Sequence, residues 1–200
     1  MTDEIQYQIG IPESLREEAA HLYDEAFGAK LSVAVPNQSK RRALLATSLV
    51  LPFAVVAITR GHLVGLAGFH TLQGALTNDM TVTKLFQQTG LLGGARATLV
   101  FSLYERRPHA RELLMDGIAV RQDMRGHGIG TKLLAVLKQY AHEHQYCRIR
   151  LDVIDTNTAA KRLYEREGFV AIRTQHFRYL RWLLGFSAAT TMIFQIPQNT

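Results

Sequence analysis

The chain has 200 residues, enough for one domain with a sizeable core, and its apolar (47%) and charged (20%) fractions are those of an ordinary globular protein. Its single cysteine, Cys147, excludes an internal disulfide framework and is typical of a reducing compartment. The net charge of +6 favours anionic partners, but nucleic acids, membrane surfaces and phosphate-rich cofactors all satisfy it, so charge alone selects none of them.

The first fifty residues predict two helices. Pro12 suits the first turn of a helix that runs from Ile11 to about Phe27, and Gly28 is expected to end that helix. A second helix is predicted over Gln38–Leu49, which is rich in alanine and leucine.

Two strands are predicted next, over Phe53–Thr59 and His62–His70, joined by a hairpin turn at Arg60-Gly61. The most apolar run of the chain, residues 43–57, is too short to span a bilayer and is divided by Pro52. The acidic N-terminus has no apolar signal region. We therefore expect a cytoplasmic protein with no membrane span.

Residues 71–109 show a looser pattern. A short helix is predicted within LTNDMTVTKLFQQTG and another within ARATLVFSLYER, with a break at Gly93-Gly94 between them. We interpret this stretch as an inserted or extended segment of a single domain that covers residues 1–200.

The second half alternates strands and helices. The predicted strands are Glu112–Val120, Arg148–Ile154, Phe169–Gln175 and Thr190–Ile196, and the predicted helices are Ile129–His144, which is strongly amphipathic, and Thr158–Glu167, which Gly168 ends. This order of elements indicates one mixed α/β domain.

A glycine-rich loop, MRGHGIGTKL, precedes the amphipathic helix. Its spacing excludes a P-loop, because Lys132 is followed by Leu133 instead of serine or threonine. A dinucleotide fingerprint needs a third glycine where Thr131 stands. On the loop alone, a plain flexible turn at a helix start remains open.

The loop and a second motif together resemble the GNAT superfamily of N-acetyltransferases. The matching positions are Arg125, Gly128, Gly130, Asn157, Leu163-Tyr164 and Gly168-Phe169. The resemblance implies a mixed, mostly antiparallel central sheet with helices on both faces and two strands that splay around the cofactor arm. It also implies transfer of an acetyl group from acetyl-CoA directly to an amine, without a metal or an acyl-enzyme.

The resemblance assigns cofactor contacts to two segments. The coenzyme A pyrophosphate is expected over the loop, on Arg125, Gly126, His127, Gly128, Ile129, Gly130 and Thr131. The pantetheine arm is expected on the backbone of Ile118, Ala119 and Val120, with a further contact at Asn157, which can also cap a helix. Lys132 is a candidate to add charge beside Arg125. Lys161 and Arg162 are weaker phosphate candidates, because a solvated helix face explains them at least as well.

Three side chains are expected to carry the chemistry. Tyr164 resembles the family tyrosine whose hydroxyl faces the sulfur, and a core tyrosine is the alternative. Asp116 and Glu112 are candidates for the base, since even-numbered positions share one face of a strand. We favour Asp116, with Glu112 acting directly or through water. A strand bulge would change which carboxylate points inward, and an acid held by an arginine is the alternative for each.

The remaining cysteine, histidine and aromatic residues are not assigned a catalytic role. Cys147 is expected in the core, and His142 and His144 cannot converge on a metal from one helix. The aromatic and basic run His176–Phe186 is interpreted as a loop on the acceptor side or a homodimer contact, with Tyr179 and Trp182 as acceptor contacts.

The acceptor itself stays open. We expect a small-molecule amine, with a protein N-terminus or lysine as the alternative. The segment 71–109 departs from the short turn of many members, which leaves the acceptor specificity open, and Gln122 stands where the family often has proline. A non-catalytic acyl-CoA sensor is a rival of another class. A protein that binds nucleic acid through its basic charge is a second rival, and we expect no nucleic acid partner.

Overall fold

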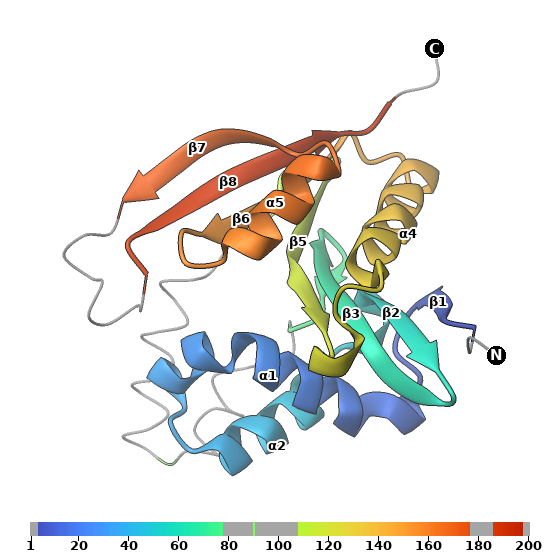
Figure 1. The fold of residues 1–200 in the computed structure, drawn as a ribbon, viewed down its shortest axis with the longest axis vertical. Helices are drawn as coiled ribbons and strands as arrows, with labels where there is room; N and C mark the ends of the chain where they lie inside the picture. Colours follow the sequence, from blue (N-terminus) through green and yellow to red (C-terminus); the bar gives the residue numbers. More distant parts are fainter. Residues whose placement is uncertain (1–3, 78–89, 91–107, 177–185, 198–200) are drawn as a thin grey trace.

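The computed structural model describes residues 4–77, 90, 108–176 and 186–197 (Figure 1). Its strands form one open sheet in the order β1-β2-β3-β5-β6-β8-β7, and β4 pairs with β3. They are β1 (Gln6–Ile9), β2 (Ala54–Thr59), β3 (His62–Thr71), β4 (Gly74–Ala75), β5 (Glu112–Val120), β6 (Arg148–Ile154), β7 (Val170–His176) and β8 (Ala188–Gln195). Among these described strands every pairing is antiparallel except that of β5 with β6. The sheet is therefore mixed and mostly antiparallel, which confirms the prediction.

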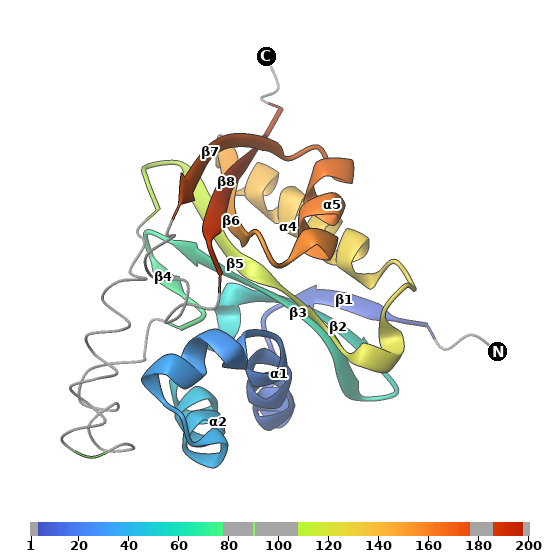
Figure 2. The same ribbon diagram turned by 60° about the vertical axis from the view of Figure 1, so that its left-hand side comes forward.

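Helices cover both faces of the sheet, as expected (Figure 2). The described helices are α1 (Arg16–Ala34), α2 (Gln38–Ser48), α4 (Ile129–Glu143) and α5 (Thr158–Arg166), with 3-10 turns at Glu13–Leu15, Leu51–Phe53 and Gln122–Met124. Along β2, Val55 and Ala57 belong to the apolar cluster beneath α4, whereas Ala54 and Val56 belong to the cluster beneath α1 and α2. The two-residue period of the strand thus divides the core into two layers.

The first helix differs from its prediction at both ends. A 3-10 turn occupies Glu13–Leu15, so α1 starts at Arg16, and the helix continues through Gly28 to Ala34. Gly28 is a packing position instead of a stop, because a Cβ there would come within 2.9 Å of Oδ1 of Asp24. That carboxylate forms a buried ion pair with Arg41 of α2.

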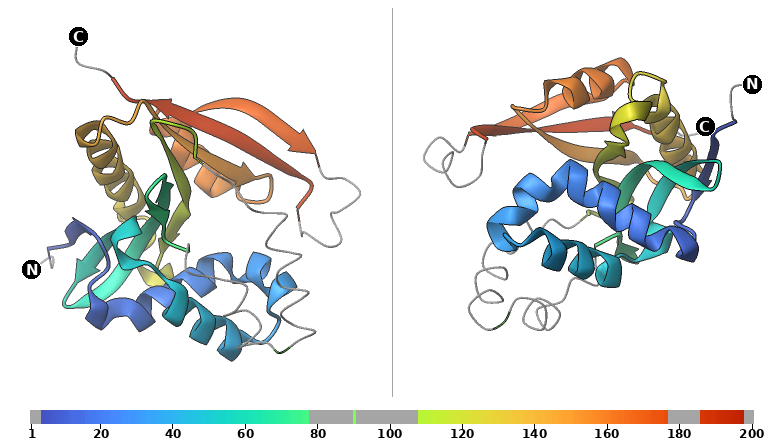
Figure 3. Two further views of the ribbon diagram at one scale, coloured as in Figure 1. Left: turned by 180° about the vertical axis from the view of Figure 1, so that it is seen from behind. Right: turned by 60° about the horizontal axis from the view of Figure 1, so that its bottom comes forward.

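The Asp24–Arg41 pair ties α1 to α2, which lie side by side (Figure 3). Arg41 also donates to the carbonyl oxygens of Val35 (2.9 Å) and Pro36 (3.3 Å). One guanidinium therefore satisfies two backbone acceptors in the segment that connects the helices. Helix α1 therefore ends where a proline follows, and not at its glycine.

The remaining predicted elements agree with the structure to within about two residues, but two short strands, β1 and β4, were missed. Residues Gln6–Ile9 form β1, which pairs with β2 from Gln6↔Ile58 to Ile9↔Val55. A four-residue strand with two glutamines gives no clear alternation, so only its pairing defines it. Both helices predicted between residues 76 and 106 lie outside the described residues, apart from a turn at Leu76-Thr77 and the helical Gly90.

A bilayer-crossing helix was not expected. In the described part of the chain, no helix is long and apolar enough to cross a membrane.

Candidate functional site

The site is organised by an opening between β5 and β6. These strands pair in parallel over four residues, from Glu112↔Arg148 to Met115↔Leu151, and then diverge (Figure 1). Beyond Met115, β5 continues to pair with β3 on its other side, from Gly117↔Gly68 to Val120↔Gly65. None of the described strands pairs with the backbone of Ile118 to Val120 on the side that faces β6. Apart from the side chains that bond to Ile118 and Val120, this side is open to another extended molecule.

Tyr164 reaches into this opening from α5. Its side chain is buried, with only 4% of the residue exposed, and its hydroxyl forms a hydrogen bond with the backbone of Ile118. Burial raises the pKa of Tyr164 to about 12, and the hydrogen bond lowers this pKa by a smaller amount. The hydroxyl is thus a proton donor at neutral pH and lies against the unpaired stretch of β5.

The glycine loop leads from the end of β5 into α4. Gly126 (φ 81°) and Gly128 (φ 74°) have left-handed backbones, which disfavour other residues. A Cβ on either would meet no atom within 4 Å, so the space beside them is open. Gly128 caps α4 without a side-chain hydrogen bond, so the first-turn N–H groups of α4 are free to bind an anion.

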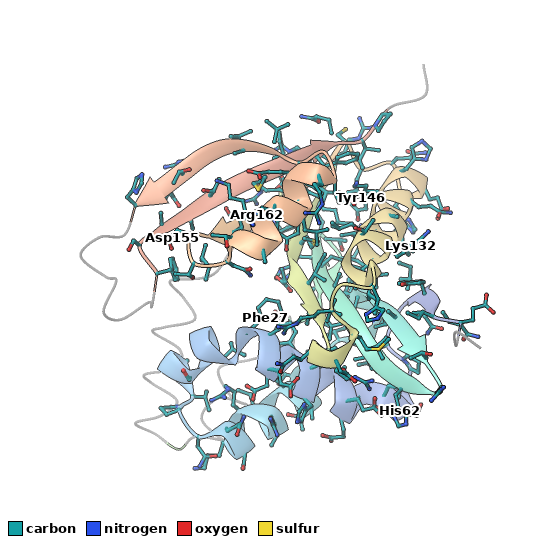
Figure 4. The ribbon with its side chains drawn as sticks, viewed as in Figure 1. Phe27, His62, Lys132, Tyr146, Asp155 and Arg162 are labelled. Atoms are coloured by element: carbon teal, nitrogen blue, oxygen red, sulfur yellow. The ribbon has the colours of Figure 1, made fainter. Side chains whose placement is uncertain are left out.

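Basic side chains surround the loop unevenly. Arg125 donates from Nε to the carbonyl oxygen of Val120 (3.2 Å), which holds it at the end of β5. Lys132 is exposed on the side of α4 that faces away from α5, and Arg162 lies on α5 (Figure 4). Lys161 forms a 4.0 Å contact with Glu165 on its own helix. The geometry therefore favours Arg125 as the loop's nearest cation.

Asn157 has a structural role in addition to the predicted one. Its side chain accepts a hydrogen bond from the backbone N–H of Ala160 (3.2 Å) and so caps the N-terminus of α5. The cap fixes the start of the helix that carries Tyr164. Its contact with a cofactor stays a prediction.

The two candidate carboxylates lie in different environments. Glu112 is fully buried, and it accepts hydrogen bonds from Nε of Arg148 (2.7 Å) and Nε of Arg150 (2.8 Å) on β6. Burial alone would raise the pKa of Glu112, but the hydrogen bonds from the two arginines outweigh burial and hold it below its usual range. This carboxylate holds β5 against β6 at the start of their paired stretch.

Asp116 lies at a bulge in β5. The pairing with β3 shifts between Gly68 and Phe69, so the strand alternation breaks at this position. Met115 and Ile118 both pack on the α4 side of the sheet, although their spacing would place them on opposite faces of a regular strand. The bulge anticipated from the sequence is present. It turns Ile118 and Val120 to the α4 side, while Asp116 keeps the side opposite Met115, where its charge acts on Tyr23 of α1.

A histidine that sequence reasoning missed lies beside Asp116. Nε2 of His70 is 2.6 Å from Oδ1 of Asp116, which is an ion-pair distance, but the contact does not have the alignment of a hydrogen bond. Oδ2 of Asp116 is buried without a hydrogen-bond partner among the described residues. His70 is the last residue of a predicted strand, and no local signal links it to a strand more than forty positions later in the chain.

Two aromatic residues of α1 border this pair. The rings of Tyr23 and Phe27 are 4.6 Å apart, and Phe27 lies on the side of α1 that faces β5 (Figure 4). A Cβ at Gly117 would come within 2.9 Å of the Phe27 ring, so the bulge and the helix are in close contact. Burial, followed by the charge of Asp116, raises the pKa of Tyr23 well above its usual value.

The other sequence candidates do not join the site. Cys147 is half-buried just before β6, His142 lies near the end of α4, and His144 caps it. No group of three or more metal-ligating side chains occurs within the ranges that the structure describes. Tyr179 and Trp182 lie outside those ranges.

Comparison with known proteins gives a family match over most of the chain. Residues 14–169 match the profile of the Acetyltransferase (GNAT) family. Among curated proteins, the chain is 36% identical over 67 residues to the uncharacterized N-acetyltransferase YobR of Bacillus subtilis, covering 34% of this chain and 27% of YobR. It is 35% identical over 57 residues to streptothricin acetyltransferase A of the same organism, covering 28% of this chain and 33% of that protein. The match therefore spans about a third or less of either relative.

Solved structures share the fold over nearly the whole chain. One of them is yncA of Salmonella typhimurium with its cofactor acetyl-CoA, with a TM-score of 0.58 and 14% identity, covering 98% of this chain and 96% of that one. At this identity the likeness concerns the fold alone.

Proposed function

Because the chain belongs to the GNAT family of acetyltransferases, we propose that it transfers an acetyl group from acetyl-CoA directly to an amine, and that the acceptor is a small molecule. The observation that carries the proposal is the opening between β5 and β6, with the Tyr164 hydroxyl at the backbone of Ile118. A thioester donor needs such a channel, in which extended backbone binds its arm and a proton donor lies beside its sulfur.

The glycine loop fits the anionic end of this donor. Open space beside Gly126 and Gly128 admits phosphate oxygens to the uncapped N–H groups of Ile129, Gly130 and Thr131. Arg125 supplies positive charge, and His127 lies next to it, with Nδ1 3.1 Å from the Arg125 carbonyl oxygen. Bound acetyl-CoA would supply the activated acetyl group, and the backbone of Ile118, Ala119 and Val120 would hold its arm.

Two residues take part in the reaction, and two others support the structure around them. Asp116 provides the negative charge that attracts the acceptor ammonium and promotes loss of its proton. Tyr164, protonated at neutral pH, donates a proton to the departing sulfur. Glu112 is engaged by Arg148 and Arg150, so we assign it to stability and not to proton transfer. Asn157 supports Tyr164 by capping its helix.

A small-molecule acceptor is supported by the partial likeness to streptothricin acetyltransferase A. A panel of amines tests the proposal, with aminoglycosides, streptothricin, polyamines, free amino acids and peptides with free N-termini, and with released thiol as the readout. We expect a small amine to give the highest kcat/KM. A preference for peptides would indicate that the acceptor is a protein. Binding of coenzyme A without transfer to any amine would favour a non-catalytic acyl-CoA sensor.

Replacing Gly128 by alanine should weaken coenzyme A binding by about tenfold, because a methyl group would enter the open space beside the anion site. The matched control is Gly61→Ala in the β2–β3 turn, since Gly61 has a similar φ of 76° and equally open surroundings. Both changes carry a backbone cost of roughly 1 kcal/mol. Calorimetric titration with coenzyme A should show the loss in Gly128→Ala alone; equal affinities would place the pyrophosphate elsewhere.

A cytoplasmic location completes the proposal, and the lone Cys147 supports it, since such compartments keep thiols reduced. Fractionation of cells that express the chain with a C-terminal tag tests it.

A further inference from the structure

The contact between His70 and Asp116 is a buried polar pair at the end of β3 and the bulge of β5. Nε2 of His70 and Oδ2 of Asp116 are both buried and lack aligned hydrogen bonds to any described residue. Buried polar atoms without partners are costly, and in native proteins they are concentrated where a ligand or a reaction completes them. The pair therefore needs an explanation beyond stability.

The orientation of the ring identifies which nitrogen is available. Nε2 faces the carboxylate at 2.6 Å and is buried, yet 19% of the His70 side chain is exposed. Because Nε2 faces the carboxylate, Nδ1 is the ring nitrogen that remains for another group. No described residue hydrogen-bonds to that nitrogen. A carboxylate on one ring nitrogen, with the other one free, is the arrangement in which an imidazole accepts a proton and the acid stabilises the resulting charge.

The backbone keeps room for this pair. A Cβ at Gly68 would come within 2.6 Å of the Leu76 side chain and 3.2 Å of Oδ2 of Asp116, so a larger residue would clash with Leu76 and crowd the carboxylate. Strand β4 continues the same edge, with Ala75 opposite His70. Among the described residues, Tyr23 of α1 is also titratable and is close enough for the charge of Asp116 to raise its pKa.

We propose that His70 is the proton acceptor of the acetyl transfer. Asp116 orients the imidazole and stabilises the positive charge that it gains; the inference rests on the proposed function. Nδ1 takes one proton from the acceptor ammonium, and the electron pair of that N–H bond stays on the nitrogen. The nitrogen forms its bond to the acetyl carbon as the carbon–sulfur bond breaks. Tyr164 gives its proton to the sulfur, and it is reprotonated by the second proton that the new amide nitrogen loses.

The test compares His70→Ala with His62→Ala, using the best amine from the acceptor panel at saturating acetyl-CoA. His62 is the matched control, because it also pairs with a carboxylate, Glu18 at 3.1 Å, but at the exposed far end of β3 (Figure 4). We expect His70→Ala to lower kcat about 100-fold and added imidazole to restore about tenfold, with coenzyme A affinity unchanged within twofold. His62→Ala should keep its kcat and show no response to imidazole.

His70→Gln is a second variant, in case His70→Ala loses activity because it misfolds. Glutamine preserves the polarity and approximate size of the side chain but cannot accept the proton. This variant should bind coenzyme A normally and be as slow as His70→Ala. Wild-type kcat in His70→Gln, or a loss in His70→Ala that imidazole does not relieve, would overturn the assignment while leaving the proposed transfer intact. Failure of the unaltered protein to acetylate any amine would instead remove the proposed function and this inference with it.

Discussion

Tyr164→Phe is expected to reduce kcat about 1,000-fold while leaving coenzyme A affinity within twofold of the parent value. The change deletes one oxygen from a buried ring and keeps its packing, including the contact with Phe169, whose ring centroid is 5.8 Å away. What is lost is a hydroxyl whose pKa of about 12 keeps it protonated beside the proposed thioester site. The thiolate would then leave without a proton, which raises the barrier of the chemical step alone.

The matched control is Tyr140→Phe on α4. Tyr140 is a half-buried tyrosine that stacks on His144 (3.9 Å) and packs against Phe69, and its pKa is also raised by burial. Because these ring contacts are with β3 and the end of α4, we expect an unchanged kcat. Stopped-flow measurement of thiol release separates chemistry from product release in both variants. If Tyr164→Phe retains at least a third of the parent rate, Tyr164 is a core residue and the proton comes from another donor.

Glu112→Gln is expected to lower the free energy of unfolding by about 2–3 kcal/mol and to leave kcat within threefold. The substitution keeps the shape of the side chain but removes the charge that Arg148 and Arg150 share at 2.7 and 2.8 Å. We place the loss at the low end for a buried ion pair because 39% of the Arg148 side chain is exposed. Urea denaturation followed by circular dichroism measures it, with Glu13→Gln, in an exposed ion pair with Arg16, as the control.

The pH dependence gives a second check on Glu112. Its pKa is lowered in the folded protein, so its contribution is fully present above the ordinary glutamate value and is lost as pH falls through the folded value. The stability difference between the parent and Glu112→Gln should therefore be constant near neutrality and shrink below about pH 4.5. Unchanged stability together with a large loss of kcat would return the role of base to Glu112.

Sequence alone ranked the two carboxylates but could not separate their roles. The spacing of both from Arg125 fits family patterns, and the even numbering predicts a shared face. Their roles diverge because of neighbours that come from elsewhere in the chain. Arg148 and Arg150 reach Glu112 from β6, and His70 reaches Asp116 from β3. Strand pairing between distant segments brings these groups together, and a local pattern does not encode it.

The motifs with fixed local geometry could be predicted from the sequence alone. Glycines at 126 and 128 occupy left-handed positions, Asn157 caps α5, and Gly168, with φ 84°, follows the end of that helix. Each depends on a backbone conformation or hydrogen bond within a few residues, so residue type and spacing suffice to predict it. The same holds for the amphipathic helix α4, whose buried positions repeat with helical period.

The sequence by itself therefore determined the family resemblance, the mixed sheet with helices on both faces, and the loop and tyrosine proposed to serve the donor. Only the tertiary structure decided that α1 passes through Gly28, that Glu112 is bound by two arginines, and that His70 meets Asp116 at a bulge. The physical reason is the range of the interactions: caps and glycine turns act within one turn of chain, whereas ion pairs between strands depend on a register that the whole sheet sets.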